Sequence, residues 1–305
     1  MSMNITRLFP YYKSALWGGD KLVENYGKTP SFSPLAESWE LSAIKGKESF
    51  VGTLPLSALG SEQTGGAVSD LGFFPMLVKF IDAALDLSVQ VHPDDEYARA
   101  HENSLGKTEC WYVVEARAGA GIYLGLKRDC TEEEIAAAVR NGSVLSLLSF
   151  VPVAAGDAFF VPAGVPHAIG KGCLICEIQQ SSDVTYRLYD YDRVGADGKK
   201  RELHIDKALS AMSHGAFDLC ANRFHPKEGE EYARSKYFAC FVAKSGEEYK
   251  FERSFCCVTA VEGEGTLNGE KISRGDSFFV PAGEKFCISG AVKALCAYVP
   301  DKEKP

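Results

Sequence analysis

The sequence has no long apolar run, no block of basic residues and no basic, apolar leader at its start. No stretch approaches 18 consecutive apolar residues, so we expect no transmembrane helix and no membrane partner. The opening residues Met1-Ser-Met-Asn-Ile-Thr-Arg7 do not resemble a signal peptide, which favours a cytoplasmic protein. A net charge of −8 disfavours nucleic acid as a partner. If the substrate is an anion, its site therefore needs a local cluster of Lys and Arg.

The sequence also lacks the two Cys-x-x-Cys pairs that a structural zinc site would require. Most of the ten cysteines lie inside apolar, strand-like runs, where a free thiol behaves as a small hydrophobic group. That usage suits a reducing compartment. Cys173-Leu-Ile-Cys176 lacks the second pair that a zinc knuckle requires. The chain has 305 residues, of which 46% are apolar, and this is enough for one large or two medium domains with real cores.

One internal repeat is present. Gly156-Asp-Ala-Phe-Phe-Val-Pro-Ala-Gly164 recurs 119 residues later as Gly275-Asp-Ser-Phe-Phe-Val-Pro-Ala-Gly283. His167 follows the first copy, whereas Phe286 stands at the same offset after the second. We interpret this pattern as two copies of one β unit, of which only the first keeps a potential metal ligand.

Segments rich in β-branched and aromatic residues dominate the chain, and Gly and Pro separate them at short intervals, as in β-sandwiches and barrels. Two segments differ: Thr131 to Leu148 begins with a Thr cap and an acidic first turn, and Leu203 to Met212 consists of good helix formers. We predict a mainly β protein of two barrels. Its parts are residues 1–75 adding strands to a first barrel, that barrel at 76–195 with a helical insertion near 129–150, a linking helix within 196–225, and a second, metal-free barrel at 226–305.

Four side chains are candidates for one metal site. The strand period of two places Gln90 and His92 on the same face of the segment 87–92. Glu109 opens a strand 17 residues later, and His167 follows a Pro-x-Gly turn. Two imidazoles, a carboxylate and an amide oxygen suit a divalent transition ion, with Zn²⁺ as the first choice and Co²⁺, Mn²⁺ and Fe²⁺ left open.

The repeat supports this interpretation to different degrees. His167 is favoured because the second copy has lost it. Aligning Gly119-x-Gly121 with Gly263-x-Gly265 places Arg253 at the position of Glu109, which predicts the loss of another ligand. The other histidines have no comparable sequence frame and are expected to be ordinary core or surface residues: His101, His204, His214 and His225.

Several motifs resemble known families. Gly-x5-Pro-x-Gly-x2-His at 156–167 resembles the second cupin motif, and Gln90-x-His92 followed by Glu109 resembles a variant of the first. More narrowly, the chain resembles the type I mannose-6-phosphate isomerases in their short bacterial form. The segments that carry this resemblance are Leu87–Asp94, Gly106–Tyr112, Val161–Ile169 and Thr185–Asp190, together with Trp17-Gly-Gly, Glu37–Ser42 and Pro75–Asp82.

The resemblance implies a zinc-dependent enzyme with two jelly-roll cupin barrels that interconverts mannose 6-phosphate and fructose 6-phosphate through a cis-enediol. By position, Gln90, His92, Glu109 and His167 correspond to the metal ligands and Arg187 to the active-site arginine. Lys79 and Ser88 correspond to phosphate-binding residues, Lys107 to a pocket lysine, and Glu177 to an acidic residue near the reacting carbons. From the residues alone, Lys79 could equally be an edge-strand lysine that points outward.

Alternatives remain at the level of mechanism and function. The general base is Lys107 or Glu177, because the two histidines are assigned to the metal. A non-catalytic cupin that binds a sugar phosphate is the second hypothesis, and a metal-dependent dioxygenase is the third. A complete ligand set in one barrel disfavours the non-catalytic cupin, and the Gln90/Glu109 combination disfavours the dioxygenase. We expect a monomer or a homodimer.

Overall fold

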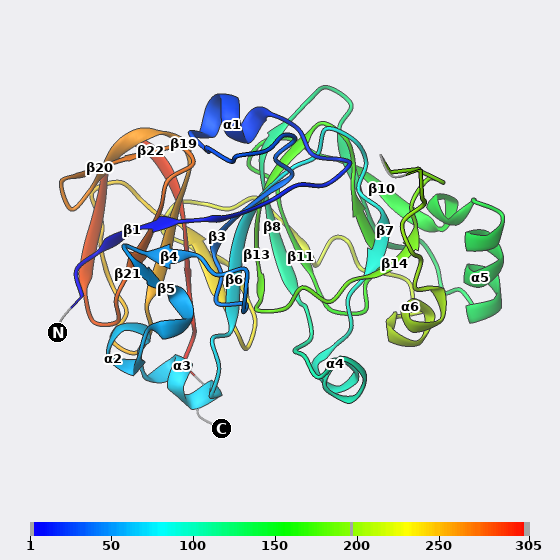
Figure 1. Cartoon of the computed structure of the whole chain (residues 1–305), viewed down its shortest axis with the longest axis horizontal. Helices are drawn as coiled ribbons and strands as arrows, with labels where there is room; N and C mark the ends of the chain where they lie inside the picture. The colour runs from blue at the N-terminus through cyan, green and yellow to red at the C-terminus, as the bar shows by residue number, and fades with distance from the viewer. Residues whose placement is uncertain (1–2, 196–197, 302–305) are drawn as a thin grey trace.

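The structure is a computed structural model that describes residues 3–195 and 198–301. These residues form a mainly β protein with a few short helices, in which three antiparallel sheets lie side by side (Figure 1). Within the described part of the chain, no helix is long and apolar enough to cross a membrane. The predicted boundary between residues 195 and 196 adjoins residues 196–197, which lie outside the described residues.

A seven-stranded sheet forms the middle layer. All seven residues of its strand β6 (Met76–Asp82) and all eight of β13 (Cys173–Gln180) are buried, because other layers cover both faces. Since successive side chains of a strand point to opposite faces, each of these strands serves two different cores. The strand order is β15 (Arg223–Phe224), β11 (Ala158–Val161), β8 (Glu109–Ala116), β13, β6, β3 (Glu37–Leu41) and β2 (Tyr11–Lys13).

A five-stranded sheet packs against one face of this middle layer. Trp111 and Ile175 of the seven-stranded sheet share a core with Ile122 and Leu124 of the five-stranded one. The strand order is β10 (Leu148–Pro152), β9 (Gly121–Leu126), β12 (His167–Ile169), β7 (Val89–Val91) and β14 (Tyr186–Tyr189). Its outer face packs against α5 (Glu132–Arg140) and α6 (Ile205–Ala211). We call the five- and seven-stranded sheets with these two helices the site half.

A ten-stranded sheet covers the other face of the middle layer, and we call it the second half. Phe80 and Cys110 of the site half pack in one core with Cys257, Phe279 and Leu295 of the second half. Its main order is β16 (Glu231–Arg234), β17 (Ala239–Val242), β22 (Lys285–Tyr298), β19 (Cys256–Leu267), β21 (Ser277–Val280), β1 (Thr6–Phe9), β4 (Phe50–Val51) and β5 (Leu54–Pro55). Two further strands extend it, β18 (Glu248–Lys250) beside β22 and β20 (Glu270–Ser273) beside β19.

The N-terminal strands are divided between the two halves. β2 and β3 join the seven-stranded sheet, whereas β1 pairs with β21 and extends the ten-stranded sheet. The chain therefore crosses from one half to the other within its first fifteen residues, as the dark blue segment in Figure 1 shows. All ten cysteines are free thiols.

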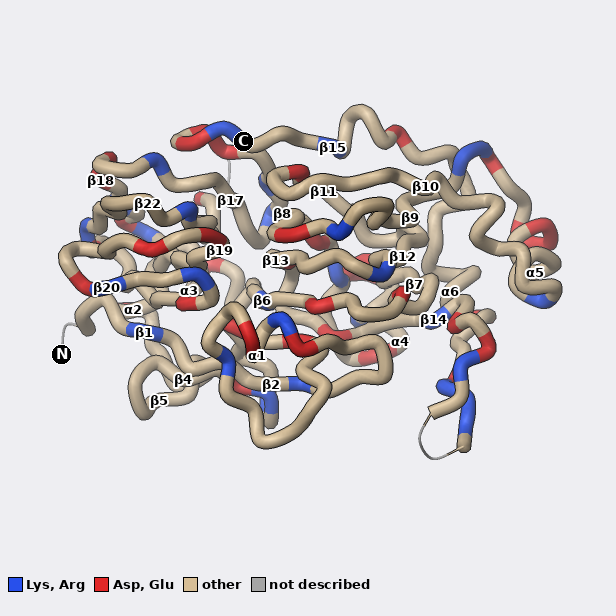
Figure 2. The backbone as a smooth tube through the Cα atoms, turned by 90° about the horizontal axis from the view of Figure 1, so that it is seen from above, with Lys and Arg blue, Asp and Glu red and all other residues tan. Residues whose placement is uncertain are grey.

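The helices of the described residues are short and lie at the periphery. α5 begins directly after Thr131. The Thr131 hydroxyl accepts a hydrogen bond from the Glu134 backbone amide at 3.2 Å, and the Glu134 carboxylate accepts one from the Thr131 backbone amide at 2.8 Å. Lys and Arg are interspersed with Asp and Glu along both halves (Figure 2). The other helices are α1 (Lys21–Tyr26), η1 (Leu56–Ala58), α2 (Ser61–Thr64), α3 (Gly66–Leu71), α4 (Asp95–Glu102) and η2 (Val144–Leu147).

Strand pairing corrects one expectation about the repeat. In the site half, β11 places Val161 opposite Glu109, and in the second half β21 places Val280 opposite Cys256. Cys256, and not Arg253, therefore occupies the position of Glu109. The alignment on the Gly-x-Gly motifs was wrong because the chain from this position to the first glycine is three residues shorter in the second copy.

Candidate active site

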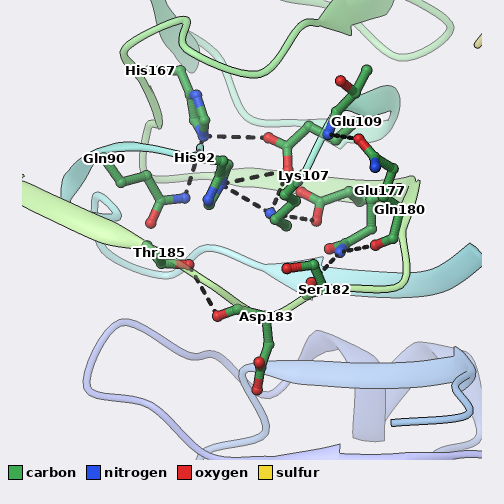
Figure 3. A network of polar contacts seen from close by, with 12 residues as sticks. Gln90, His92, Lys107, Glu109, His167, Glu177, Gln180, Ser182, Asp183 and Thr185 are labelled. Carbon is green, nitrogen blue, oxygen red and sulfur yellow. Dashed lines mark hydrogen bonds and ion pairs between the residues drawn. The ribbon is translucent and has the colours of Figure 1, made fainter. Parts of the chain in front are cut away.

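Three predicted ligands converge between the sheets of the site half. Glu109 is the first residue of β8, His167 is the first residue of β12, and His92 directly follows β7. Their ligand atoms lie within 4.8 Å of one another, and Glu109 lies 3.6 Å from His92 Nε2 and 3.3 Å from His167 Nε2. Figure 3 shows the three side chains pointing toward one another from separate segments of the chain. Among the described residues, no other group of three His, Cys, Asp or Glu side chains is close enough to share an ion.

The surroundings orient these side chains as ligands. His92 Nδ1 lies 2.8 Å from the Val184 carbonyl oxygen, and His167 Nδ1 lies 2.8 Å from that of Val165. Because a carbonyl can only accept, each Nδ1 carries the proton and each Nε2 is an acceptor, that of His92 facing Lys107 Nζ at 2.9 Å and that of His167 facing Gln90 Nε2 at 3.4 Å. Glu109 Oε1 is buried without a hydrogen-bond partner. Such an orphaned oxygen beside two available imidazole nitrogens fits a divalent cation.

Burial shifts the pKa values of all three groups. Burial, and then the charge of Lys107, lowers the pKa of His92 well below its usual value and the pKa of His167 to about 4. Both imidazoles are therefore neutral near pH 7, which is the form that binds metal. Burial, together with the neighbouring Glu177 carboxylate, raises the pKa of Glu109 to about 7.

Gln90, the fourth predicted ligand, lies beside the other three. Strand β7 pairs with β12 so that Gln90 is directly opposite His167. The Gln90 Nε2 atom lies 3.4 Å from His167 Nε2. A rotation of the amide by half a turn would present its oxygen to the same point.

A cavity of about 260 Å³ lies next to this cluster, between the two sheets of the site half. Six of the predicted site residues line it: Lys79, Ser88, Gln90, Lys107, Glu177 and Arg187. Lys107 connects the cavity to the ligand cluster. Its Nζ lies 2.9 Å from His92 Nε2 and 3.4 Å from Glu177 Oε1, and it forms an ion pair with Glu109 (Figure 3).

One face of the seven-stranded sheet supplies the cavity wall. Trp39, Lys79, Glu177 and Trp111 lie directly opposite one another on β3, β6, β13 and β8. Lys79 Nζ lies 3.0 Å from Glu177, and the Trp111 indole N–H donates to Glu177 at 2.9 Å. Lys79 is thus an interior residue of a central strand, and its interpretation as an outward-pointing edge lysine is wrong.

The ion pairs of this wall keep its groups charged. Burial alone would lower the pKa of Lys79, but Glu177 and Glu37 raise it above the usual value. Burial would raise the pKa of Glu177, but Lys107 and Lys79 lower it. Glu177 is therefore a carboxylate near neutral pH, although it is almost fully buried.

Two arginines also line the cavity. Arg187 on β14 pairs with Gln90 on β7, and its Nη1 donates to the Glu202 carbonyl at 2.7 Å. Arg201 was not identified from the sequence. The Asp190 carboxylate holds it through Nε at 2.7 Å and Nη2 at 2.5 Å. The basic run Lys199-Lys-Arg201 was the available signal, but a basic run more often marks a solvated surface.

The cavity differs in charge from the whole chain. Its lining includes five basic side chains, Lys13, Lys79, Lys107, Arg187 and Arg201, and three acidic ones, Glu37, Glu177 and Asp183. Burial, and then the charge of Arg201, lowers the pKa of Arg187, which reflects two guanidinium groups held near each other. This is the local basic cluster that an anionic substrate requires in a chain of net charge −8.

Comparisons with known proteins show which family the chain resembles. A family profile described as the cupin domain of mannose-6-phosphate isomerase matches residues 228–299. The probable mannose-6-phosphate isomerase GmuF of Bacillus subtilis is 41% identical over 249 residues, which cover 77% of this chain and 78% of that protein. The mannose-6-phosphate isomerase ManA of the same organism is 44% identical over 212 residues, or 67% of this chain and 66% of that one.

One solved structure is similar to nearly the whole chain. The crystal structure of a mannose 6-phosphate isomerase from Bacillus subtilis superposes with a TM-score of 0.85 at 31% identity, and the match covers 97% of this chain and 99% of the other. The family and the enzyme class predicted from the motifs are thereby confirmed. The chain belongs to the mannose-6-phosphate isomerase family.

Proposed function

We propose that this chain interconverts mannose 6-phosphate and fructose 6-phosphate with the help of a bound divalent metal ion. The observation that carries the proposal is the convergence of His92, Glu109 and His167 beside a positively charged cavity whose wall contains Lys107 and Glu177. The relatives GmuF and ManA carry the name of this activity.

The metal would be held by Gln90, His92, Glu109 and His167. Two imidazole nitrogens with one carboxylate and one amide oxygen suit Zn²⁺, which is our first choice. When bound, the ion supplies a Lewis acid that stabilises negative charge on a sugar oxygen. The buried position of the histidines keeps them neutral and ready to bind.

Lys107 and Glu177 are the proposed proton-transfer pair. Isomerisation of the aldose removes the proton from C2, passes through a cis-enediol and returns a proton to C1, while one hydroxyl proton shifts between the two oxygens. Glu177 is held as a carboxylate, so it can accept a proton, and Lys107 Nζ, 3.4 Å from it, can donate to an oxygen. The general base stays Lys107 or Glu177. Arg187 adds a fixed positive charge near the developing oxyanion.

The part of the cavity lined by Arg201 is the proposed phosphate site. Arg201 presents a guanidinium group, which matches phosphate oxygens in geometry and charge. Ser88 and Lys79 stay proposed phosphate contacts. Because Lys79 is already paired with Glu37 and Glu177, we assign the larger part of the phosphate interaction to Arg201.

We also propose that the two halves are two cupin-type units, one with the metal and one without. The repeat at 156–164 and 275–283 and the equivalent pairings of β11 with β8 and β21 with β19 support this proposal. The division at residues 75, 195 and 225, the helical insertion near 129–150, the cytoplasmic location and the monomeric or homodimeric state stay predictions.

An assay of mannose 6-phosphate conversion tests the proposal. We expect turnover by the purified protein, loss of turnover after treatment with a chelator and recovery on addition of Zn²⁺. Glu177→Gln should lower kcat at least 100-fold. Binding of mannose 6-phosphate without any turnover would instead identify the non-catalytic cupin, and oxygen consumption would identify a dioxygenase.

The phosphate site has its own matched test. Asp190 holds both Arg193 and Arg201, but only Arg201 lines the cavity. Arg201→Met should therefore raise KM at least tenfold, whereas Arg193→Met should change it less than threefold. Equal effects of the two substitutions would show that they act only through Asp190.

A further inference from the structure

Asp95 forms an unusual junction at the start of α4. The neighbouring Asp94 caps this helix by accepting from the Tyr97 amide, so Asp95 is free for other partners. Asp95 Oδ1 accepts from the Gly106 amide at 3.0 Å and from Gln180 Nε2 at 3.1 Å. Asp95 Oδ2 accepts from the hydroxyl of Tyr237. These three donors come from distant parts of the sequence, and the last belongs to the second half.

Two of these donors hold the segment that carries Lys107 and Glu109. The side-chain oxygen Oε1 of Gln180 accepts a hydrogen bond from the Thr108 backbone N–H at 2.7 Å, and the Gln180 backbone N–H donates to the Thr108 carbonyl at 3.0 Å. The Lys107 amide donates to the Pro93 carbonyl at 3.0 Å. The backbone on either side of Lys107 is thus attached, through Asp95 and Gln180, to the first turn of α4.

Gly106 permits this attachment. A Cβ atom at position 106 would lie 2.5 Å from the carbonyl carbon of Asp94 and 2.6 Å from the amide nitrogen of Asp95. These are backbone atoms that cannot turn aside, so only glycine allows the loop to approach α4 so closely. The close approach is therefore built into the chain at residue 106.

Tyr237 brings the second half to this junction. It lies between β16 and β17, its ring packs on Phe73 with centroids 6.0 Å apart, and it is 5% exposed. Burial and the bond to Asp95 raise the pKa of Tyr237 to about 12. The hydroxyl therefore stays protonated and donates to a carboxylate, which is the stronger, charge-assisted kind of hydrogen bond.

We propose that Tyr237 and Asp95 are positioning residues through which the second half holds Lys107 and Glu109 in place. Neither residue lines the cavity or belongs to the ligand cluster. Their effect passes through the Gly106 amide and Gln180 to the backbone of residues 106–109. The second half would thus take part in the chemistry of the site half. The activity readouts of this proposal rest on the proposed isomerase function, but its structural readout does not.

Tyr237→Phe tests the proposal, since it removes one hydroxyl and keeps the ring on Phe73. Hydrogen exchange of the metal-free protein should show faster exchange in the peptide containing residues 103–109 and unchanged exchange in β19 and β22. Zn²⁺ affinity should fall by up to about tenfold, which is the lower end of the effect of losing a direct partner of a metal ligand, because Tyr237 acts only through Asp95 and Gln180. We expect kcat to fall by a similar factor and KM to change less than threefold, because the phosphate end is untouched.

Tyr298→Phe is the matched control. The Tyr298 hydroxyl also donates to a carboxylate, Glu231, at 2.6 Å, but both residues lie in the second half. This variant should leave Zn²⁺ affinity, kcat and exchange of residues 103–109 unchanged. Asp95→Asn should reproduce the effects of Tyr237→Phe, and the double variant should be no worse than either single one.

Two results would overturn the inference. The first is wild-type exchange of residues 103–109 in Tyr237→Phe, and the second is an equal loss of Zn²⁺ affinity in Tyr298→Phe. A wild-type protein that fails to convert mannose 6-phosphate would contradict the proposed function alone, because the exchange measurement needs neither substrate nor metal.

Discussion

Position 167 and its counterpart at 286 show what a single residue changes in this fold. Phe286 is almost fully buried and packs on Tyr249 and Phe251 with ring centroids 5.5 and 6.4 Å apart. His167 is equally buried, but its Nε2 faces Glu109. The same strand position thus accepts either an aromatic core residue or a proposed metal ligand, so we expect that metal binding and folding can be separated by substitution.

His167→Phe should fold and lose its metal. The Phe ring is close in size to imidazole, and the pairing of β12 with β7 uses backbone atoms only. Removal of one of two imidazole ligands should lower Zn²⁺ affinity at least 100-fold. Metal analysis after dialysis and a thermal unfolding curve measure the two effects. One equivalent of Zn²⁺ retained in the folded variant would contradict the assigned ligand set.

The pKa of Glu37 predicts a pH dependence. Burial would raise this pKa, but Lys79 and then Lys13 lower it below the usual range. A depressed pKa in the folded state contributes stability above the unfolded value of about 4.3, and this contribution is lost as the pH falls below that value. Urea unfolding should therefore show a constant difference between wild type and Glu37→Gln from about pH 6 to 8, and a shrinking difference below about pH 4. A difference that grows on acidification would contradict this assignment.

At the scale of elements, the row of side chains across β3, β6, β13 and β8 joins stability to function. Cross-strand neighbours of opposite charge support each other, and here Lys79 lies between Glu177 on one side and Trp39 on the other. Its ammonium also contacts Glu37 at 3.2 Å. Strand β6 therefore holds the proposed catalytic carboxylate of Glu177 through Lys79, which is itself buried.

Lys79→Met should destabilise the protein by about 3–5 kcal/mol, because two buried carboxylates lose their shared cation. Lys13→Met is the control, since Lys13 contacts the same Glu37 at 2.8 Å but its side chain is 43% exposed. Its loss should cost less than about 1 kcal/mol. Urea unfolding at neutral pH measures both, and equal costs would show that burial does not determine the strength of these pairs.

At the scale of the whole molecule, the N-terminal segment connects the two halves. Lys28 Nζ lies 2.7 Å from Glu40 of the seven-stranded sheet and 2.5 Å from the Gly275 carbonyl of the second half. The Tyr26 carbonyl also packs on Gly275, so closely that a Cβ atom there would lie 2.2 Å from it. The repeat glycine of the second half is thus part of the contact between the halves.

The repeat supplies a matched pair of substitutions for this contact. Gly156 and Gly275 are equivalent and have φ of +95° and +89°, but nothing lies within 4 Å of a Cβ atom at Gly156. Gly156→Ala should cost about 1–2 kcal/mol from backbone strain alone. Gly275→Ala should cost about 1–3 kcal/mol more, because the methyl group displaces the N-terminal segment. Thermal or urea unfolding compares them, and equal costs would mean that the halves adjust to each other freely.

Much of the site was predictable from local patterns. Alternation along strands placed Gln90 and His92 on one face, and the loss of a histidine in the second copy distinguished His167 from an ordinary core residue. The family and the enzyme class followed from motifs of adjacent residues. Such features depend on spacing within one strand or turn, and the strand period of two transmits them directly into structure.

Other features depended on which strands become neighbours. Three contacts or equivalences each join segments far apart in the chain: the pairing of Lys79 with Glu177 and Glu37, the equivalence of Cys256 with Glu109, and the contact of Tyr237 with Asp95. The amino-acid sequence by itself determined the residue types of the candidate site, the β class and the chemistry available. Only the tertiary structure decided which charges meet and which half supports the other, because pairing between distant strands depends on register and burial that no local spacing records.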